Sequence, residues 1–193
     1  MKLLLVKHSN SNHNADQTAR EWGLTDEGIA RCKPLASHIA PYKPQRLFAS
    51  TMLKTQQTAH YAAQELDNIP ILSNPLLEEH NRQSNAPYGS LEGFRLRIKQ
   101  MFEQPDDLIF GNETANQALQ RFGQGVDEAL KQANSGENVV IIAHGTVNVL
   151  FTAQYNDIDI YDMWLKLKLP SIIVLDLPSF ALDTVIYDAG VSL

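Results

Sequence analysis

Short apolar runs alternate along this chain with longer amphipathic stretches. The apolar runs are rich in Leu, Ile and Val and are bounded by polar or turn-forming residues, so we expect each to form a strand. The predicted strands cover residues 2–6, 46–50, 69–72, 138–144, 171–177 and 183–190. The first of them, KLLLV, is continuously apolar after its lysine, which indicates a strand covered on both faces in a parallel sheet.

Between the strands, apolar residues recur at the spacing of one helix face. Thr25 is a suitable N-cap for the first helix, Ile29, Cys32 and Leu35 fall on one side of it, and Pro41 ends it. Further helices are predicted over residues 51–66, 91–103, 113–134 and 147–155.

Three stretches lack the apolar pattern of a helix or a strand. Residues 9–24 are polar and are expected to form a long loop, which in a small domain is usually functional or mobile. Residues 74–93 are irregular and contain several Pro and Gly. Residues 156–164 are acidic, and we expect a solvated loop there that could border the entrance of a site or an oligomer contact.

Strands that alternate with helices predict an α/β protein. We expect a three-layer α/β/α sandwich around a mostly parallel central sheet. The 193 residues suit one compact domain, and neither an internal repeat nor a linker rich in Pro, Gly or Ser divides the sequence. A single domain over residues 1–193 is therefore the expected organisation.

Charge and composition narrow the class of protein. The net charge is −6 and no block of basic residues occurs, so binding to nucleic acid through phosphate neutralisation is not expected. No apolar run approaches the roughly 18–20 residues that span a bilayer, and the N-terminal run is too short for a secretory leader. We therefore expect a cytoplasmic protein without a membrane partner. The single cysteine, Cys32, excludes an internal disulfide and argues against a zinc site built on cysteines.

The ends of the predicted strands carry the residues with chemical potential. In open α/β sheets ligands bind beyond the carboxyl ends of the strands, so side chains there can face one cleft. Two histidines, two lysines and two acids hold such positions: Lys7, His8, Lys54, Glu78, Glu79 and His144. Each also has an ordinary explanation as a surface charge or a hydrogen-bonded histidine, and the strand ends alone leave that choice open.

Five segments, in the same order, resemble motifs of the histidine phosphatase superfamily, the phosphoglycerate-mutase-like proteins. The family's first strand ends in Arg-His-Gly, followed by Ser or Thr and then Asn; here VKHSNSNHN matches at His8, Ser11 and Asn14. The other segments are LTDEGIARCKPLA (24–36), ASTMLKTQQTA (49–59), LLEEH with LEGF (76–80 and 91–94) and VVIIAHGTV (139–147). The length of the chain resembles the family's phosphatases more than its mutases.

The resemblance implies the phosphoglycerate-mutase-like fold and hydrolysis of a small phosphorylated substrate, with no metal and no other cofactor. His8 would attack phosphorus and form a phosphohistidine, and His144 would donate a hydrogen bond to the transferred group. Glu78 aligns with the family's proton donor, and Glu79, one residue out of register, is the alternative. The implied phosphate-binding residues are Lys7, Ser11, Asn14, Lys54 and Gly145. Because relatives often pair, a homodimer is possible.

Several positions depart from the family's pattern. Lysine replaces arginine at Lys7 and Lys54, which keeps the charge but loses the planar fork that holds two phosphate oxygens. Ser9 replaces a glycine, and a serine would be strained there if the backbone needed a positive φ. The spacing between LLEEH and LEGF also differs, which indicates rebuilt loops on the substrate side.

Two functions therefore stay open. The first is a phosphatase with a phosphohistidine intermediate and altered phosphate binding. The second is a weakened or inactive relative that binds a phosphorylated ligand or a protein partner. Retention of both histidines and of an acid favours the first, whereas the two lysines favour the second. A phosphoglycerate-type mutase is less favoured than either.

Overall fold

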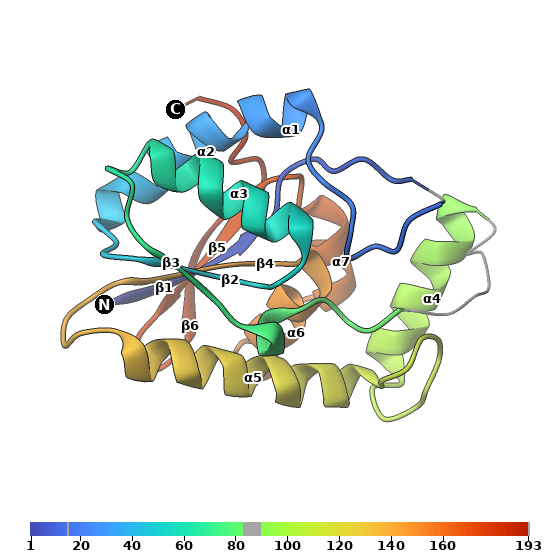
Figure 1. The fold of residues 1–193 in the computed structure, drawn as a ribbon. Helices are drawn as coiled ribbons and strands as arrows, with labels where there is room; N and C mark the ends of the chain where they lie inside the picture. Colours follow the sequence, from blue (N-terminus) through green and yellow to red (C-terminus); the bar gives the residue numbers. More distant parts are fainter. Residues whose placement is uncertain (15, 83–89, 193) are drawn as a thin grey trace.

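The computed structural model describes residues 1–14, 16–82 and 90–192. They form a six-stranded sheet with helices packed around it (Figure 1). The strands are β1 (Lys2–Lys7), β2 (Leu47–Ala49), β3 (Ile71–Ser73), β4 (Val139–Ala143), β5 (Ser171–Asp176) and β6 (Ala181–Ile186). They lie in the order β3-β2-β4-β1-β5-β6. The first four strands of that order are parallel, and β5 is antiparallel to both of its neighbours. The predicted mostly parallel sheet is confirmed.

Helices cover both faces of the sheet (Figure 1). On one side lie α1 (Asp26–Ala30), α2 (Cys32–Ile39) and α3 (Leu53–Gln64). On the other lie α4 (Leu91–Glu103), α5 (Ala115–Gln132), α6 (Gly145–Tyr155) and α7 (Ile160–Lys166). Short 3₁₀ turns, η1 and η2, cover Ala40–Tyr42 and Pro75–Leu77. None of the helices in the described part of the chain is long and apolar enough to cross a membrane.

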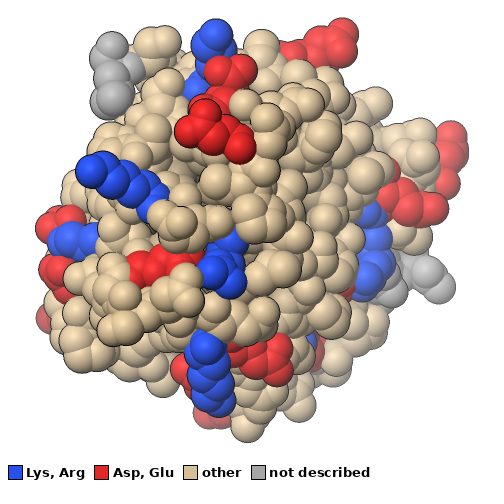
Figure 2. Space-filling model, turned by 60° about the vertical axis from the view of Figure 1, so that its left-hand side comes forward, with Lys and Arg blue, Asp and Glu red and all other residues tan. Residues whose placement is uncertain are grey.

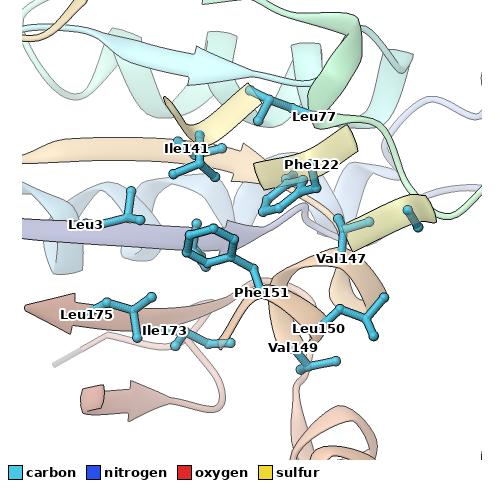
Figure 3. Packing of buried hydrophobic residues seen from close by; sticks show 14 of the residues in the cluster. Leu3, Leu77, Phe122, Ile141, Val147, Val149, Leu150, Phe151, Ile173 and Leu175 are labelled. Carbon is cyan, nitrogen blue, oxygen red and sulfur yellow. The ribbon is translucent and has the colours of Figure 1, made fainter. Parts of the chain in front are cut away.

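Side chains of β1 alternate between two apolar cores. Leu3 and Leu5 point into the core covered by α5 and α6, where the Phe122 and Phe151 ring centroids lie 5.9 Å apart (Figure 3). Leu4 points into the opposite core, under α2 and α3. Because both faces of β1 are buried, its sequence is a continuous apolar run rather than an alternating one. Fully burying each such side chain stabilises the fold by about 1.5–3 kcal/mol.

The helix predicted after Thr25 is divided in two. Thr25 caps α1 as expected, its hydroxyl accepting a hydrogen bond from Gly28 N at 3.0 Å. α1 ends at Ala30 and α2 begins at Cys32. The break occurs because Pro34 has no N–H to donate to the carbonyl of Ala30.

The prediction of a solvated loop over residues 156–164 is wrong for the second half of that stretch, because α7 begins at Ile160. The Asp159 carboxylate caps this helix by accepting from Asp162 N at 2.8 Å. Met163 is buried in the core that α6 also contacts. An N-cap and a buried apolar side chain thus outweigh the acidic composition of the stretch.

Most other element boundaries agree with the predicted ones to within two residues. The last strand is an exception, since β6 spans Ala181–Ile186 rather than residues 183–190. Of the stretch 74–93, predicted to be irregular and rebuilt, residues 83–89 lie outside the described residues.

Charged side chains on the surface are mixed rather than segregated. Figure 2 shows basic and acidic side chains interspersed over one face, with neither sign forming a continuous area on its described part. Lys2 Nζ lies 2.8 Å from Asp176 and 2.9 Å from Asp183. Such partly exposed pairs are each worth about 0–1 kcal/mol, so the surface contributes little to the fold through its charges.

Candidate active site at the strand ends

His8 and His144 follow two neighbouring parallel strands. β1 and β4 pair in register as far as Lys7 and Ala143, and His8 N extends the ladder by donating to the Ala143 carbonyl at 3.1 Å. This brings the two imidazole rings together, with centroids 5.3 Å apart and planes at 67°. Both residues are buried: His8 is 8% exposed and His144 is 1% exposed.

The surroundings of His8 favour one neutral tautomer. Its Nδ1 lies 2.7 Å from the carbonyl oxygen of Ser9. Because a carbonyl only accepts, Nδ1 carries the hydrogen, and Nε2 keeps its lone pair while the ring is neutral. Burial, followed by the charges of His144 and Lys54, lowers the pKa of His8 well below its ordinary value. The ring is therefore available as a nucleophile at neutral pH.

His144 is held by the end of β2. Its Nε2 lies 2.9 Å from the Ser50 hydroxyl, whereas its buried Nδ1 has no hydrogen-bond partner within the described ranges. Burial, followed by the charges of Lys54 and Arg82, lowers the pKa of His144 well below its ordinary value. A neutral imidazole with one uncommitted nitrogen is suited to contact a bound oxyanion.

Lys7 lies across the start of α6. Its Nζ donates to the carbonyl of Leu167 at 2.8 Å. A Cβ added at Gly145 would lie 3.1 Å from Lys7 Cε, so the glycine after His144 leaves room for the lysine chain. Burial lowers the pKa of Lys7 to about 8, against the opposing charge of Glu79.

Lys54 reaches the site from the first turn of α3. Its Nζ donates to the carbonyl of Ala19 at 3.1 Å and lies 5.0 Å from the centroid of the Trp22 ring. The residue is only 6% exposed. Burial lowers the pKa of Lys54 to about 8, again against the charge of Glu79. Both lysines therefore remain cationic at neutral pH, although their pKa values lie closer to neutrality than that of a surface lysine.

Glu78 and Glu79 direct their carboxylates to different partners. Glu78 has extended backbone angles, so consecutive side chains point to opposite sides. The Glu78 carboxylate accepts hydrogen bonds from Arg20 and Thr51. The Glu79 carboxylate accepts from Thr146 N at 3.2 Å and from the next amide of α6 at 3.3 Å. The Glu79 carboxylate thus lies against the first turn of α6, the helix that follows His144.

Arg121 positions both acids from α5, a role that the sequence did not indicate. Its guanidinium donates to the carbonyls of Glu78 at 2.9 Å and Glu79 at 3.1 Å. Its Nη2 also lies 2.7 Å from the Glu113 carboxylate, which neutralises its charge. In the sequence Arg121 is one polar residue of an amphipathic helix, so no local signal distinguishes it.

Arg82 is a second residue beside the site that no local sequence pattern indicates. Its Nη2 lies 3.3 Å from the Glu79 carboxylate and donates to the Thr146 hydroxyl. Its guanidinium carbon lies 5.2 Å from the centroid of the Phe94 ring. Arg82 belongs to an irregular stretch without periodicity, so only the folded chain places a guanidinium beside the candidate site.

Ser9, where the resemblance predicts a glycine, is accommodated without strain. The backbone of Ser9 lies outside the left-handed region. Its hydroxyl donates to the Gly28 carbonyl at 2.7 Å, and its N–H donates to Thr58 Oγ1 at 3.0 Å. A Cβ at Gly28 would lie 2.1 Å from the carbonyl oxygen of Asn10, so the glycine is needed on α1 instead.

Ser11 and Asn14 are not brought to the histidines by any hydrogen bond of the described residues. Asn14 Oδ1 accepts from Asp16 N at 3.0 Å, and its carbonyl accepts from Trp22 Nε1 at 2.9 Å. Ser11 pairs with Leu24 in an isolated bridge. These contacts order the loop itself, so their predicted phosphate contacts stay predictions.

The assembled groups have the properties of an oxyanion site. A neutral imidazole with a free lone pair lies beside a second imidazole, with two ammonium groups and a carboxylate around them. In the described ranges, no three His, Cys, Asp or Glu side chains gather in a way that could hold a metal ion. The arrangement can bind an anion and attack its central atom.

Comparisons with known proteins bear on this arrangement. YhfR of Bacillus stearothermophilus has a similar structure, with a TM-score of 0.73 at 18% identity, over 96% of this chain and 95% of that chain. The mycobacterial glucosyl-3-phosphoglycerate phosphatase Rv2419c, solved with inorganic phosphate, gives 0.73 at 15% identity and 99% coverage of both chains. A mutant phosphoserine phosphatase from Entamoeba histolytica, solved with phosphoserine, gives 0.69 at 14% identity and 98% coverage of both. None of the curated proteins matches the sequence.

These structural similarities confirm the predicted phosphoglycerate-mutase-like fold. The family itself follows from the sequence. The model of the histidine phosphatase superfamily (branch 1) matches residues 3–180, which extend from the second residue of β1 past the end of β5. The chain therefore belongs to branch 1 of the histidine phosphatase superfamily.

Proposed function

We propose that this protein is a phosphatase that hydrolyses a phosphomonoester with His8 as the nucleophile. The observation that carries the proposal is the pair of buried imidazoles, 5.3 Å apart where two parallel strands end. His8 has its Nδ1 on a carbonyl and its Nε2 lone pair available, which is the state that attack on phosphorus requires. Membership of the family supports the same activity.

The reaction has two steps. In the first, Nε2 of His8 bonds to phosphorus while the bond from phosphorus to the leaving oxygen breaks, and that oxygen takes a proton from an acid. In the second, water attacks the phosphohistidine, the N–P bond breaks, and the proton lost by water returns to the acid. His144 donates to an equatorial oxygen, and the ammonium groups of Lys7 and Lys54 offset the charge on the others.

The contacts support Glu79 ahead of Glu78 as the acid. The Glu79 carboxylate lies on the first amides of α6, directly after His144, and its charge raises the pKa of both buried lysines against the effect of burial. Glu78 is already engaged by Arg20 and Thr51. Burial raises the pKa of Glu79, but the charge of Arg82 and the backbone amide hydrogen bonds outweigh it and hold that pKa below its ordinary value. A bound phosphate adds a negative charge beside Glu79, which favours its protonation.

The nucleophile is tested with an aryl phosphate at acidic to neutral pH. We expect His8→Ala to lower kcat by about 10³-fold or more, because removing a nucleophile abolishes the covalent route. The matched control is His60→Ala on α3, whose side chain is exposed, and it should keep the wild-type rate. Acid-labile phosphate should be trapped on the wild type and on His60→Ala only. Equal rates for wild type and His8→Ala would exclude the proposed function for this substrate class.

The acid is tested by comparing Glu79→Gln with Glu78→Gln. We expect Glu79→Gln to lower kcat by about 10²-fold or more on an alkyl phosphate, whose leaving oxygen needs a proton. Its loss should be smaller on an aryl phosphate, whose leaving group departs without full protonation. Glu78→Gln should show no such dependence on the leaving group. The opposite pattern would return the role to Glu78, as the alignment with the family suggests.

One observation favours the second candidate, a non-enzymatic phosphate binder. Lys7 and Lys54 occupy the positions of the family's two arginines, and each ammonium group already donates to a backbone carbonyl. Weak stabilisation of the transferred group would leave binding without turnover. Inorganic phosphate that binds the wild type with no hydrolysis of any phosphomonoester in a metabolite panel would establish this alternative.

A further inference from the structure

Arg82, Glu79 and Thr146 each contact the other two, at the helix turn that follows His144. Arg82 contacts the Glu79 carboxylate at 3.3 Å and the hydroxyl of Thr146. Glu79 in turn accepts from Thr146 N at 3.2 Å. Thr146 lies two residues after His144, so the guanidinium is bound to the same helix turn that follows the second imidazole.

Aromatic residues hold this guanidinium in place. Its carbon lies 5.2 Å from the Phe94 centroid, and Phe94 lies 6.0 Å from Trp164. Trp164 Nε1 donates to the Thr146 hydroxyl at 3.3 Å, which is the same oxygen that Arg82 contacts. A guanidinium on an aromatic face retains its charge and presents its N–H groups in the plane of the fork. The orientation of the Arg82 guanidinium beside Glu79 and Thr146 is therefore set by its neighbours.

The charge of Arg82 acts on the groups of the candidate site. It lowers the pKa of Lys7, Lys54 and His144, and it lowers that of Glu79. The cation thus lies within electrostatic reach of both predicted phosphate-binding lysines and of the second imidazole. Arg82 therefore adds a third positive charge to those two lysines, and it carries the planar fork that an ammonium group lacks.

We propose that Arg82 supplies the bidentate contact to the transferred phosphoryl group that Lys7 and Lys54 cannot form. On this proposal, which rests on the proposed function, the guanidinium exchanges the carboxylate of Glu79 for two phosphate oxygens. The exchange leaves Glu79 beside the bound phosphate without its cation, in the position from which it donates a proton. Arg82 thereby supplies, from another segment of the chain, the planar guanidinium that lysine does not provide at positions 7 and 54.

Orthovanadate, a phosphate analogue, provides the test through its inhibition constant, together with kcat and KM on an aryl phosphate. Arg82→Lys keeps the charge and removes the fork, and we expect it to weaken vanadate binding about 10- to 100-fold and to lower kcat/KM similarly. The matched control is Arg46→Lys, because Arg46 pairs with Glu137 at 3.2 Å before β2 and β4, at the opposite edge of the sheet. The control should change neither quantity more than about twofold.

A second substitution distinguishes a bidentate contact of the Arg82 guanidinium from a purely structural role of Arg82. Lys54→Arg added to Arg82→Lys should restore a large part of the vanadate affinity, which no repair of local packing would do. Unchanged vanadate affinity in Arg82→Lys, with an active wild type, would overturn the inference and leave the proposed function intact. An inactive wild type that still binds vanadate through Arg82 would reject the enzyme and retain the contact. A wild type that binds no vanadate would reject both.

Discussion

At the scale of single residues, burial decides what the charged groups of this site can do. Lys7 and Lys54 lie where the resemblance to the family predicts arginine, and burial lowers the pKa of each to about 8. A guanidinium in the same surroundings would keep its charge, because its ordinary pKa is above about 12. The lysines thus make the charge of the site depend on pH in a range where arginines would not.

This dependence predicts weaker anion binding in alkali. Each lysine is cationic below its pKa and neutral above it, so phosphate affinity should fall as pH rises through about 8. A bound anion shifts this loss upward, since opposite charge favours the protonated form. The double variant Lys7→Arg/Lys54→Arg should retain its affinity through the same range and turn over faster at neutral pH. The measurement is the phosphate inhibition constant from about pH 6 to about pH 10.

Two results would count against this account. One is a wild-type inhibition constant that does not change between neutral and alkaline pH. The other is a double variant that loses affinity along the same curve as the wild type, which would assign the dependence to phosphate or to another group.

At the scale of elements, the loop after His8 is shaped by the helices on one face of the sheet. Ser9 is bound to α1 and α3 through Gly28 and Thr58. Leu24 N donates to the Gln57 side chain at 2.6 Å, and Lys54 holds the carbonyl of Ala19. A polar segment without periodicity therefore acquires its conformation from elements that follow it in the sequence.

Two glycines test how tightly this loop is packed. Gly28→Ala would place Cβ 2.1 Å from the Asn10 carbonyl, and we expect it to lower the free energy of unfolding by about 1–3 kcal/mol and to lower activity. Gly123→Ala, inside α5, meets no atom within 4 Å and should raise that free energy by about 0.5–1 kcal/mol. Urea unfolding measures both. Equal effects of the two substitutions would show that the loop yields to the added methyl group.

At the scale of the whole molecule, the candidate site exists because one edge of the sheet collects the ends of separate segments. β1 delivers His8, β4 delivers His144, and β2 delivers Ser50. The segment after η2 brings the acids, and Arg121 on the long helix α5 fixes their backbone. The parallel arrangement of these strands places their ends together, although they lie far apart in the sequence.

The sequence alone was sufficient to predict the α/β class, the strands and the nearness of the two histidines. Apolar runs identify buried strands, and parallel strands end at one edge, so residues that follow such strands converge without knowledge of other contacts. The motifs also indicated the family, which its model confirms. The loop predicted over residues 156–164 is wrong from Ile160 onward, because the Asp159 cap and the buried Met163 outweigh the acidic composition of the stretch.

The tertiary structure alone decided which groups surround the histidines. Glu78 and Glu79 are chemically alike and adjacent, and only the extended backbone between them sends one to Arg20 and the other to α6. Arg82 and Arg121 reach the site from segments whose local sequence carries no signal of it. Local patterns determine elements because they reflect burial along one segment, whereas side-chain partners from distant segments depend on how those elements pack.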